Sequence, residues 1–424
     1  MQTVSSKAPV PQGLVGIVIA LFLQTAVFSS ETWPQFRGPS GQGTTQQTDL
    51  PKVWNQNEGI VWKTMLPGIG HSSPVHDGSV IWLTTAEKDG ASMSAMALDA
   101  ASGRILHQLT IFTPAQIEEI HHSNSYASPT PVLHQGRLYV HFGTYGTACI
   151  ETSTGRILWK NTDFPVSHDG GPGSSPIIDK GLLLLTLDGM DTQRVVALEL
   201  ETGKMRWTRA RSAPYPVNPV TMRAFSTPLI IEHRGLSMLI SPGAQQCHAY
   251  DPQTGQELWH VRFSGFSTVP RPVYNGRYCY LCTGFYKPEL WAVDPGGSGD
   301  VTRTHIKWKF KGEVSETPSP LIVDDALYVL SNKGILTILN TETGKRQGVL
   351  RMGGNYSSSP ILANRLIYFC NEDGMVKLVD AALVKPRIIQ INRMEERIMA
   401  SPAVLENDLI IRTDAALYRI HGCH

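Results

Sequence analysis

The chain has 424 residues, with 37 lysines and arginines against 36 aspartates and glutamates. This balance excludes the strongly basic composition that is typical of nucleic-acid-binding proteins. Six cysteines are too few to staple a chain of this length as a disulfide scaffold. The length allows two or three ordinary domains or one large all-β domain, and internal repeats decide between them.

The first 30 residues predict a secretory signal. Lys7 is their one charged side chain, the apolar run 13–28 follows it, and the small residues Ser29 and Ser30 come next. An uncleaved anchor is the alternative, because the run approaches the roughly 17 residues that span a bilayer. No cysteine for lipid attachment follows the run. We therefore expect a signal peptide over 1–30, an N-terminal extension over 31–58, and a periplasmic or secreted protein.

A repeat led by proline occupies the rest of the chain. Each unit has a short apolar run, a turn and a second apolar run, as in SSPVHDGSVIWLTT (72–85). Proline has no amide proton to donate, so it is expected where a strand begins. The interval of about 47 residues is typical of four-stranded propeller blades. The eight prolines are Pro74, Pro131, Pro176, Pro228, Pro272, Pro320, Pro360 and Pro402.

A glycine turn recurs in five units, and a tryptophan follows the glycine by four residues in three of them, as in CIETSTGRILW (149–159); Trp308 stands at the same place in a further unit. Glycine supplies a positive φ, and Asp, Thr or Ser side chains can bond the turn backbone. A large ring repeated on the last strand is predicted to pack between neighbouring blades. The turn glycines are Gly103, Gly155, Gly203, Gly255 and Gly344, and the tryptophans are Trp159, Trp207, Trp259 and Trp308.

The ends of the repeat predict how the ring closes. The eighth unit ends after three strands, whereas GIVWKTML (59–66) has the form of a lone fourth strand, with Trp62 in the tryptophan position. Pairing the two would remove the open edge of the ring. We expect an all-β, eight-bladed propeller of four-stranded antiparallel blades over 59–424, closed by this N-terminal strand.

The pattern Asp-x-x-Thr-Gly-x-x-x-Trp, best seen at 251–259, resembles the repeat of PQQ-like, quinoprotein-type β-propellers. WPQFRGPSGQG (33–43) also resembles the start of exported bacterial proteins with such repeats. The family includes dehydrogenases dependent on pyrroloquinoline quinone (PQQ) and the non-enzymatic BamB-type scaffold of outer-membrane-protein assembly. The resemblance implies the fold over 33–424 and leaves both functions open.

Candidate ligand-binding residues precede the first strand of each unit, where they should ring the mouth of a central channel. A concave mouth lined by mixed charge is the default position for a ligand. Solvated loop residues that pair across blades are the alternative. The candidates are His71, His121, His122, Asn124, His168, Asp169, Arg223, Arg271, Glu313 and Tyr356.

Motifs for metal binding or nucleophilic catalysis are not found. The chain has no H-E-x-x-H, no EF-hand loop, no pair of C-x-x-C motifs and no G-x-S-x-G. Cys279 and Cys282 of CYLC lie three apart in an expected strand and therefore point to opposite faces. GGSGD (296–300) interrupts a hairpin turn before a strand, which argues against a phosphate loop.

Two functions follow from these observations. The first is an exported, non-catalytic binding scaffold that presents the mouth to an envelope protein or a small ligand, with no nucleic acid and no cofactor. The alternative is a dehydrogenase of alcohols or sugars that uses PQQ and calcium, with Asp169 or Glu313 as base. An adjacent Cys-Cys pair and a C-x-x-C-H haem site are both missing from the sequence, which favours the scaffold.

Overall fold

The computed structural model describes residues 1–424 except 6, 9–30, 213–217, 383–384 and 423–424. Its two compact units are Met1–Ser30 and Glu31–His424. Most of the expected signal peptide lies outside the described residues, so it stays a prediction. No helix among the described residues is long and apolar enough to cross a membrane.

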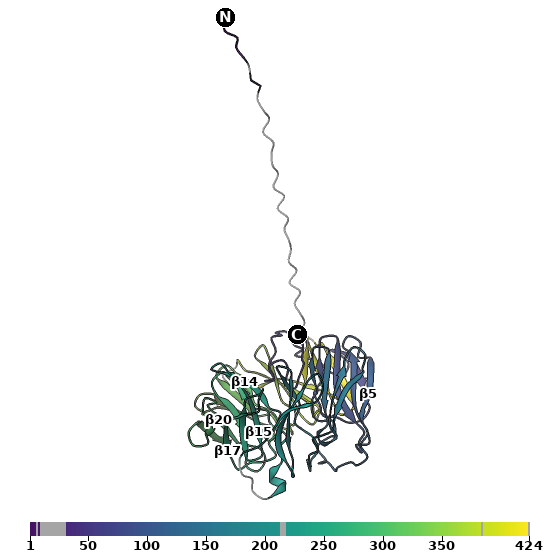
Figure 1. Cartoon of the computed structure of the whole chain (residues 1–424), viewed down its shortest axis with the longest axis vertical. Coiled ribbons are helices and arrows are strands. Elements are labelled where there is room, and N and C mark those ends of the chain that lie inside the picture. Colours follow the sequence, from purple (N-terminus) through teal and green to yellow (C-terminus); the bar gives the residue numbers. More distant parts are fainter. Residues whose placement is uncertain (6, 9–30, 213–217, 383–384, 423–424) are drawn as a thin grey trace. The chain divides into compact units, whose positions relative to one another are not determined.

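Residues 31–424 form a β-propeller of eight sheets, each with four antiparallel strands except one that gains a fifth (Figure 1). The expected fold class is confirmed. We number the blades in chain order, with strands given from the channel outward. Short 3₁₀ turns occur at η1 (Gly143–Tyr145) and η2 (Pro219–Met222).

The first four blades contain the following strands. Blade 1 has β2 (Val75–His76), β3 (Val80–Ala86), β4 (Met93–Asp99) and β5 (Ile105–Phe112); blade 2 has β6 (Val132–His134), β7 (Arg137–His141), β8 (Thr147–Glu151) and β9 (Ile157–Asn161). Blade 3 has β10 (Ile177–Asp179), β11 (Leu182–Asp188), β12 (Gln193–Glu199) and β13 (Met205–Ala210); blade 4 has β14 (Leu229–His233), β15 (Leu236–Gly243), β16 (Gln246–Tyr250), β17 (Glu257–Arg262) and the added β21 (Gly299–Asp300).

The other four blades complete the ring. Blade 5 has β18 (Val273–Tyr274), β19 (Cys279–Cys282), β20 (Glu289–Val293) and β22 (Ile306–Lys311); blade 6 has β23 (Leu321–Val323), β24 (Ala326–Leu330), β25 (Ile335–Asn340) and β26 (Arg346–Arg351). Blade 7 has β27 (Ile361–Ala363), β28 (Leu366–Cys370), β29 (Met375–Asp380) and β30 (Ile388–Arg393); blade 8 has β31 (Ala403–Leu405), β32 (Asp408–Arg412), β33 (Ala416–Ile420) and β1 (Ile60–Met65).

The N-terminal strand β1 closes the ring, as expected. It pairs antiparallel with β33, so that Lys63 lies opposite Tyr418 and Met65 opposite Ala416. The yellow C-terminal strands accordingly lie beside the blue strands of blade 1 in Figure 1. This pairing joins the two ends of the propeller and leaves no unpaired edge in blade 8 at β33.

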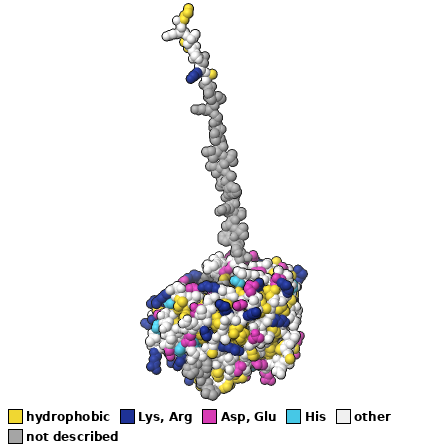
Figure 2. All heavy atoms as spheres, viewed as in Figure 1, with side chains coloured by type: hydrophobic (Ala, Val, Ile, Leu, Met, Phe, Trp, Pro, Cys, Tyr) yellow, Lys and Arg dark blue, Asp and Glu magenta, His cyan; other side chains and the backbone are white. Residues whose placement is uncertain are grey.

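The burial pattern follows the position of each strand in its blade. Middle strands contact a neighbouring blade on both faces, so they are continuously apolar: all seven residues of β11 are buried. Outer strands have one solvated face and alternate, as β22 does along IKWKFK. The core is therefore a series of apolar layers between blades. Figure 2 shows side chains of both charges interspersed on the outer surface, in keeping with the small net charge.

Tryptophans of the outer strands contact the glycine turns of the next blade. The indole Nε1 of Trp62 donates to the Ala100 carbonyl (3.0 Å), and that of Trp159 donates to the Leu200 carbonyl (2.9 Å). A Cβ at Gly203 would lie 2.5 Å from the Trp159 ring, so the blades could not approach this closely with a larger residue. The same contact joins Trp207 to Gly255 and Trp308 to Gly344, whereas Gly155 meets His107 and Leu109.

Residues 33–45, which we call the floor segment, cross the end of the channel opposite the loops that enter each blade. Trp33 exchanges backbone hydrogen bonds with His76 of blade 1, and the Pro34 carbonyl accepts from the Leu133 amide of blade 2. Farther along, Gln42 accepts from the Tyr274 amide of blade 5, and Thr44 forms a bridge with Leu362 of blade 7. The floor segment thus ties blades on opposite sides of the ring and closes one end of the channel.

Candidate binding cavity at the channel mouth

The open end of the channel holds a cavity of about 500 Å³. This volume is within the range of small-molecule sites. All eight blades contribute lining residues from the segments that precede their inner strands, and Phe36 of the floor segment lies at the bottom. The cavity is therefore a cup, open on one side and closed on the other.

Two rings of side chains line this cup, because the segment before each inner strand is extended and alternate residues face the channel. The upper ring contains the residues three positions before each proline: His71, Ser128, Gly173, Phe225, Val269, Thr317, Ser357 and Met399. The lower ring, which we call the hydroxyl belt, contains the residues directly before the prolines: Ser73, Thr130, Ser175, Thr227, Ser319, Ser359 and Ser401.

The hydroxyl belt connects neighbouring blades. The Ser73 amide donates to Thr130 Oγ1 (2.9 Å), the Thr130 amide to Ser175 Oγ (2.9 Å), and the Ser175 amide to Thr227 Oγ1 (3.0 Å). Equivalent hydrogen bonds run from Arg271 to Ser319, from Ser319 to Ser359, and from Ser359 to Ser401. Each inner strand would otherwise leave this amide unpaired, so the belt is architectural.

Arg271 occupies the belt position of blade 5. The prediction that its side chain lies at the mouth is wrong. Its buried side chain turns to the floor, where Nη1 donates to the Phe36 carbonyl (2.7 Å) and Nε donates to the Pro228 carbonyl (3.0 Å). Arg37 lies beside it and donates to the Pro320 carbonyl (2.8 Å). Burial lowers the pKa of both guanidinium groups to about 9. The positive charge of Arg271 lowers the pKa of Arg37 further.

The rim of the cup combines neutral and charged groups. Burial and the positive charges of Arg412 and Arg397 lower the pKa of His71 to about 3, so its imidazole is neutral at physiological pH. The Arg223 guanidinium donates to the Asp169 carboxylate, which links the loops that enter blades 3 and 4. Asn124 donates to the carbonyls of Gly170 (2.7 Å) and Pro172 (3.1 Å). His71, His121, Asn124, Asp169 and Arg223 therefore lie around one cavity, as the sequence predicted.

Four other candidates do not line it. Tyr356 is fully buried in the core of blades 6 and 7, since four positions before the proline the side chain points away from the channel. His168 is buried under Gly143, and burial lowers its pKa to about 4. Glu313 is exposed outside the cavity, and His122 contacts the His121 ring at a tilted angle (ring centroids 4.1 Å apart) without reaching the lining.

Sequence reasoning missed most of the lining. Phe225, Met399 and the hydroxyl belt carry neither charge nor imidazole, the two features on which the sequence-based prediction of a site depends. The signal that would have found them is positional: the residues one and three before each repeat proline. Glu316, Phe285 and Phe36 complete the lining from a loop, a turn and the floor segment.

The lining does not fit PQQ with calcium. The charged groups among the described lining residues are Asp169, Glu316 and Arg223, so the cup is acidic by one charge when the histidines are neutral. PQQ carries three carboxylates and needs cations to hold them. The one arginine, Arg223, is already paired with Asp169. The same ion pair engages the Asp169 carboxylate, which calcium would need as a ligand.

A closed ring of eight four-stranded blades, repeated tryptophan–glycine contacts and a channel blocked at one end define a PQQ-like propeller. The family model described as outer membrane protein assembly factor BamB matches residues 44–209, 97–260 and 235–421. The chain belongs to this family. The resemblance expected from the sequence is confirmed.

Curated relatives are distant, and the match covers only part of each. Over 293 residues the chain is 24% identical to a tetrathionate hydrolase of Acidithiobacillus ferrooxidans, covering 66% of this chain and 53% of that protein. Over 204 residues it is 24% identical to the outer membrane protein assembly factor BamB of Legionella pneumophila, covering 48% and 49%. The chain spans about half the length of the curated relatives it matches.

Solved structures agree on the fold. BamB from Moraxella catarrhalis superposes with a TM-score of 0.60 at 16% identity, covering 85% of this chain and 99% of that one. A europium-containing methanol dehydrogenase gives a TM-score of 0.69 at 12% identity, covering 91% and 90%. One architecture therefore serves an assembly factor and an oxidoreductase, so function must be argued from the site.

Proposed function

We propose that the protein is an exported, non-catalytic binding propeller that docks an envelope protein on its mouth face. In this proposal the partner inserts a side chain or chain end into the cup. The observation that carries it is the contrast between the two rings. The belt repeats Ser or Thr around the channel, whereas the upper ring changes from imidazole to hydroxyl, phenyl and thioether.

That contrast has a physical reason. A belt residue must accept a backbone amide from the neighbouring blade, which fixes its chemistry. An upper-ring residue lines the cavity without holding a strand amide of the next blade, and where it is hydrogen-bonded, as Ser128, Thr317 and Ser357 are, it has another side chain as a partner. Different side chains at equivalent positions break the eightfold symmetry of the cup, and an asymmetric cup can select one ligand orientation.

Exposed apolar side chains around the cup support a protein partner. Ile117, Val220, Phe285 and Tyr286 come from loops on the mouth face and are 41%, 43%, 48% and 68% exposed. Phe285 packs edge-on against Phe266, which holds it at the rim. Exposed aromatic residues beside a pocket are typical of interaction surfaces.

Site-specific cross-linking tests this proposal. A photoreactive residue replaces Tyr286 on the mouth face, and the matched control replaces Leu236, which is 44% exposed at the start of β15, next to the β14–β15 turn at the opposite face. Irradiation in intact cells should join the chain to one defined envelope protein from position 286 and not from position 236. The same adduct from both positions, or none from 286, would reject the mouth as a docking face.

The dehydrogenase alternative has its own test. The purified chain is incubated with PQQ and calcium and assayed for dye reduction with alcohols and aldose sugars. We expect no turnover above that of free PQQ. The lining has a single arginine, Arg223, for the three carboxylates of PQQ, and this arginine is already paired with Asp169. Turnover that requires the quinone would establish the dehydrogenase instead.

A further inference from the structure

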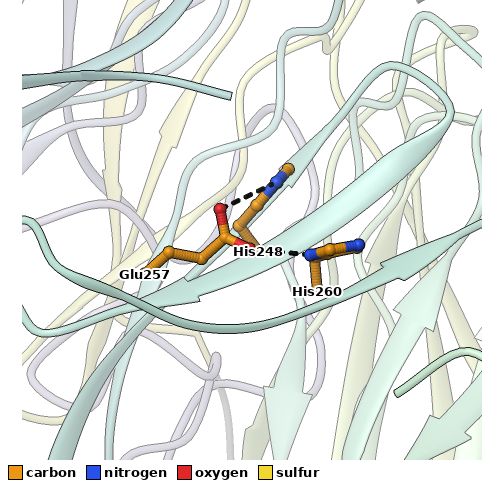
Figure 3. A group of neighbouring side chains, drawn as sticks. All are labelled: His248, Glu257 and His260. Atoms are coloured by element: carbon orange, nitrogen blue, oxygen red, sulfur yellow. Dashed lines mark hydrogen bonds and ion pairs between the residues drawn. The ribbon is translucent and has the colours of Figure 1, made fainter. Parts of the chain in front are cut away.

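The outer part of blade 4 holds a cluster of metal-ligating side chains away from the mouth cavity. His248 lies on β16, directly opposite His260 on β17, and Glu257 lies at the start of β17. Figure 3 shows the Glu257 carboxylate between the two imidazole rings. One donor atom from each residue lies within 4.8 Å of the others. The three side chains therefore converge on one point.

A β-bulge produces this convergence. Residues 257 and 260 are three apart and would point to opposite faces of a regular strand. The register shifts between Ala249 and Tyr250, so that Glu257 pairs with Tyr250 while Trp259 pairs with Ala249. The extra residue turns Glu257 to the face that carries both histidines.

The donor spacing matches a divalent transition metal. His260 Nδ1 lies 2.7 Å from Glu257 Oε1, and His248 Nε2 lies 3.7 Å from Glu257 Oε2. Tetrahedral ligands at 2.0–2.1 Å from zinc are about 3.3 Å apart, between these two values.

Groups behind the cluster can orient its ligands. His260 Nε2 lies 3.8 Å from the Asp300 carboxylate on β21, and Nδ1 is the ring nitrogen that faces Glu257. Asp300 belongs to GGSGD, the insertion in blade 5 that adds a fifth strand to blade 4. The Tyr250 ring stacks on His248 (5.4 Å between centroids) and fixes its plane.

Equivalent positions in the other blades carry no such set. The structure pairs Val196 with Thr208 in blade 3 and Trp291 with Lys309 in blade 5, where blade 4 pairs His248 with His260. The side chain of His248 is fully buried, and its Nδ1 has no partner among the described residues. An ion would bind the other ring nitrogen, Nε2, which faces Glu257 Oε2.

We propose that His248, Glu257 and His260 bind a divalent transition-metal ion, with zinc as the probe. Glu257 is 24% exposed and His260 is 10% exposed in their side chains, so an ion can enter from solvent. Three protein ligands leave a fourth position for water, beside the Ser212 hydroxyl that lies 3.2 Å from His248 Nε2. The ion would clamp β16 to β17, and this proposal is independent of the function of the mouth.

Calorimetric titration of the tag-free full chain with zinc chloride tests the site. We expect one ion per chain and a melting temperature that rises with zinc and returns after chelation. Glu257→Gln and His260→Gln should each weaken binding at least tenfold. His107→Gln, on the outer strand of blade 1, is the matched control and should bind like the wild type.

A spectroscopic measurement keeps the test independent of folding. Cobalt in place of zinc should give visible d–d absorption of a tetrahedral site, and this absorption should be lost in Glu257→Gln while the far-ultraviolet circular dichroism stays unchanged. Tight zinc binding retained in both ligand variants, or no stoichiometric binding by the wild type, would overturn the proposal.

Discussion

The two ends of the channel differ in how their charged side chains are used. At the floor, Arg37 and Arg271 are buried and donate to backbone carbonyls of the floor segment and of two blades, at Pro228 and Pro320. At the mouth, the Arg223–Asp169 pair is partly exposed and joins two loops. One end uses its charges to fix the backbone, whereas the other leaves its polar groups facing an open cup. Stability should therefore depend on the floor, and binding on the mouth.

The largest effect should come from opening the ring. Deletion of residues 59–66 removes β1, exposes the edge of β33 and leaves the Trp62 contact with blade 1 unmade. The melting temperature should fall by more than about 10 °C, or cooperative unfolding should be lost. Deletion of Ala115 and Gln116, which are exposed in a mouth loop, is the control. Equal melting of both deletion variants would contradict the closure.

A pair of arginine variants sharpens the contrast between the two ends. Arg271→Ala leaves the Phe36 and Pro228 carbonyls without a donor and opens a cavity, so it should cost about 2–4 kcal/mol in urea unfolding. Arg223→Ala removes a partly exposed ion pair and should cost less than about 1 kcal/mol. Similar costs at the two sites would remove the distinction.

The pH dependence tests whether the region under the rim is dry. His168 has a pKa of about 4 in the folded chain and about 6.5 when unfolded, so the unfolded chain binds more protons between these values. Stability should therefore fall as the pH drops from about 6.5 to 4. Between pH 7 and pH 5, the free energy of unfolding of His168→Gln should fall by about 2 kcal/mol less than that of the wild type. An identical loss in both proteins would mean that His168 is solvated.

Much of the fold could be predicted because proline, glycine and tryptophan each mark a backbone requirement. The motif WPQFRGPSGQG is a further case, since it forms most of the floor segment. Gly41 has a φ of 69°, and a Cβ there would lie 2.4 Å from the Arg271 guanidinium. The glycine itself is visible in the sequence. Its contact with Arg271, which lies 230 residues further along the chain, is not.

The site was less predictable because only the residues one and three positions before each repeat proline follow a common pattern, whereas the charged lining residues lie in loops of differing length. Asp169 and Arg223 were placed at the mouth by their loops, and the cavity contains both. The predictions for Tyr356 and Arg271 are wrong for different reasons. Tyr356 lies four positions before its proline, so its side chain points into the core. Arg271 lies directly before its proline, but its long side chain turns toward the floor segment. Likewise, Glu257 and His260 meet through a bulge that strand alternation does not predict.

The most direct test measures how tightly the partner captured at position 286 binds to variants of each face. Phe285→Ala and Tyr286→Ala should weaken binding at least tenfold while the melting temperature stays within about 2 °C of the wild type. Leu236→Ala, on the opposite face, should leave both quantities unchanged. Wild-type affinity in the mouth variants, or equal weakening by Leu236→Ala, would contradict a docking surface at the mouth.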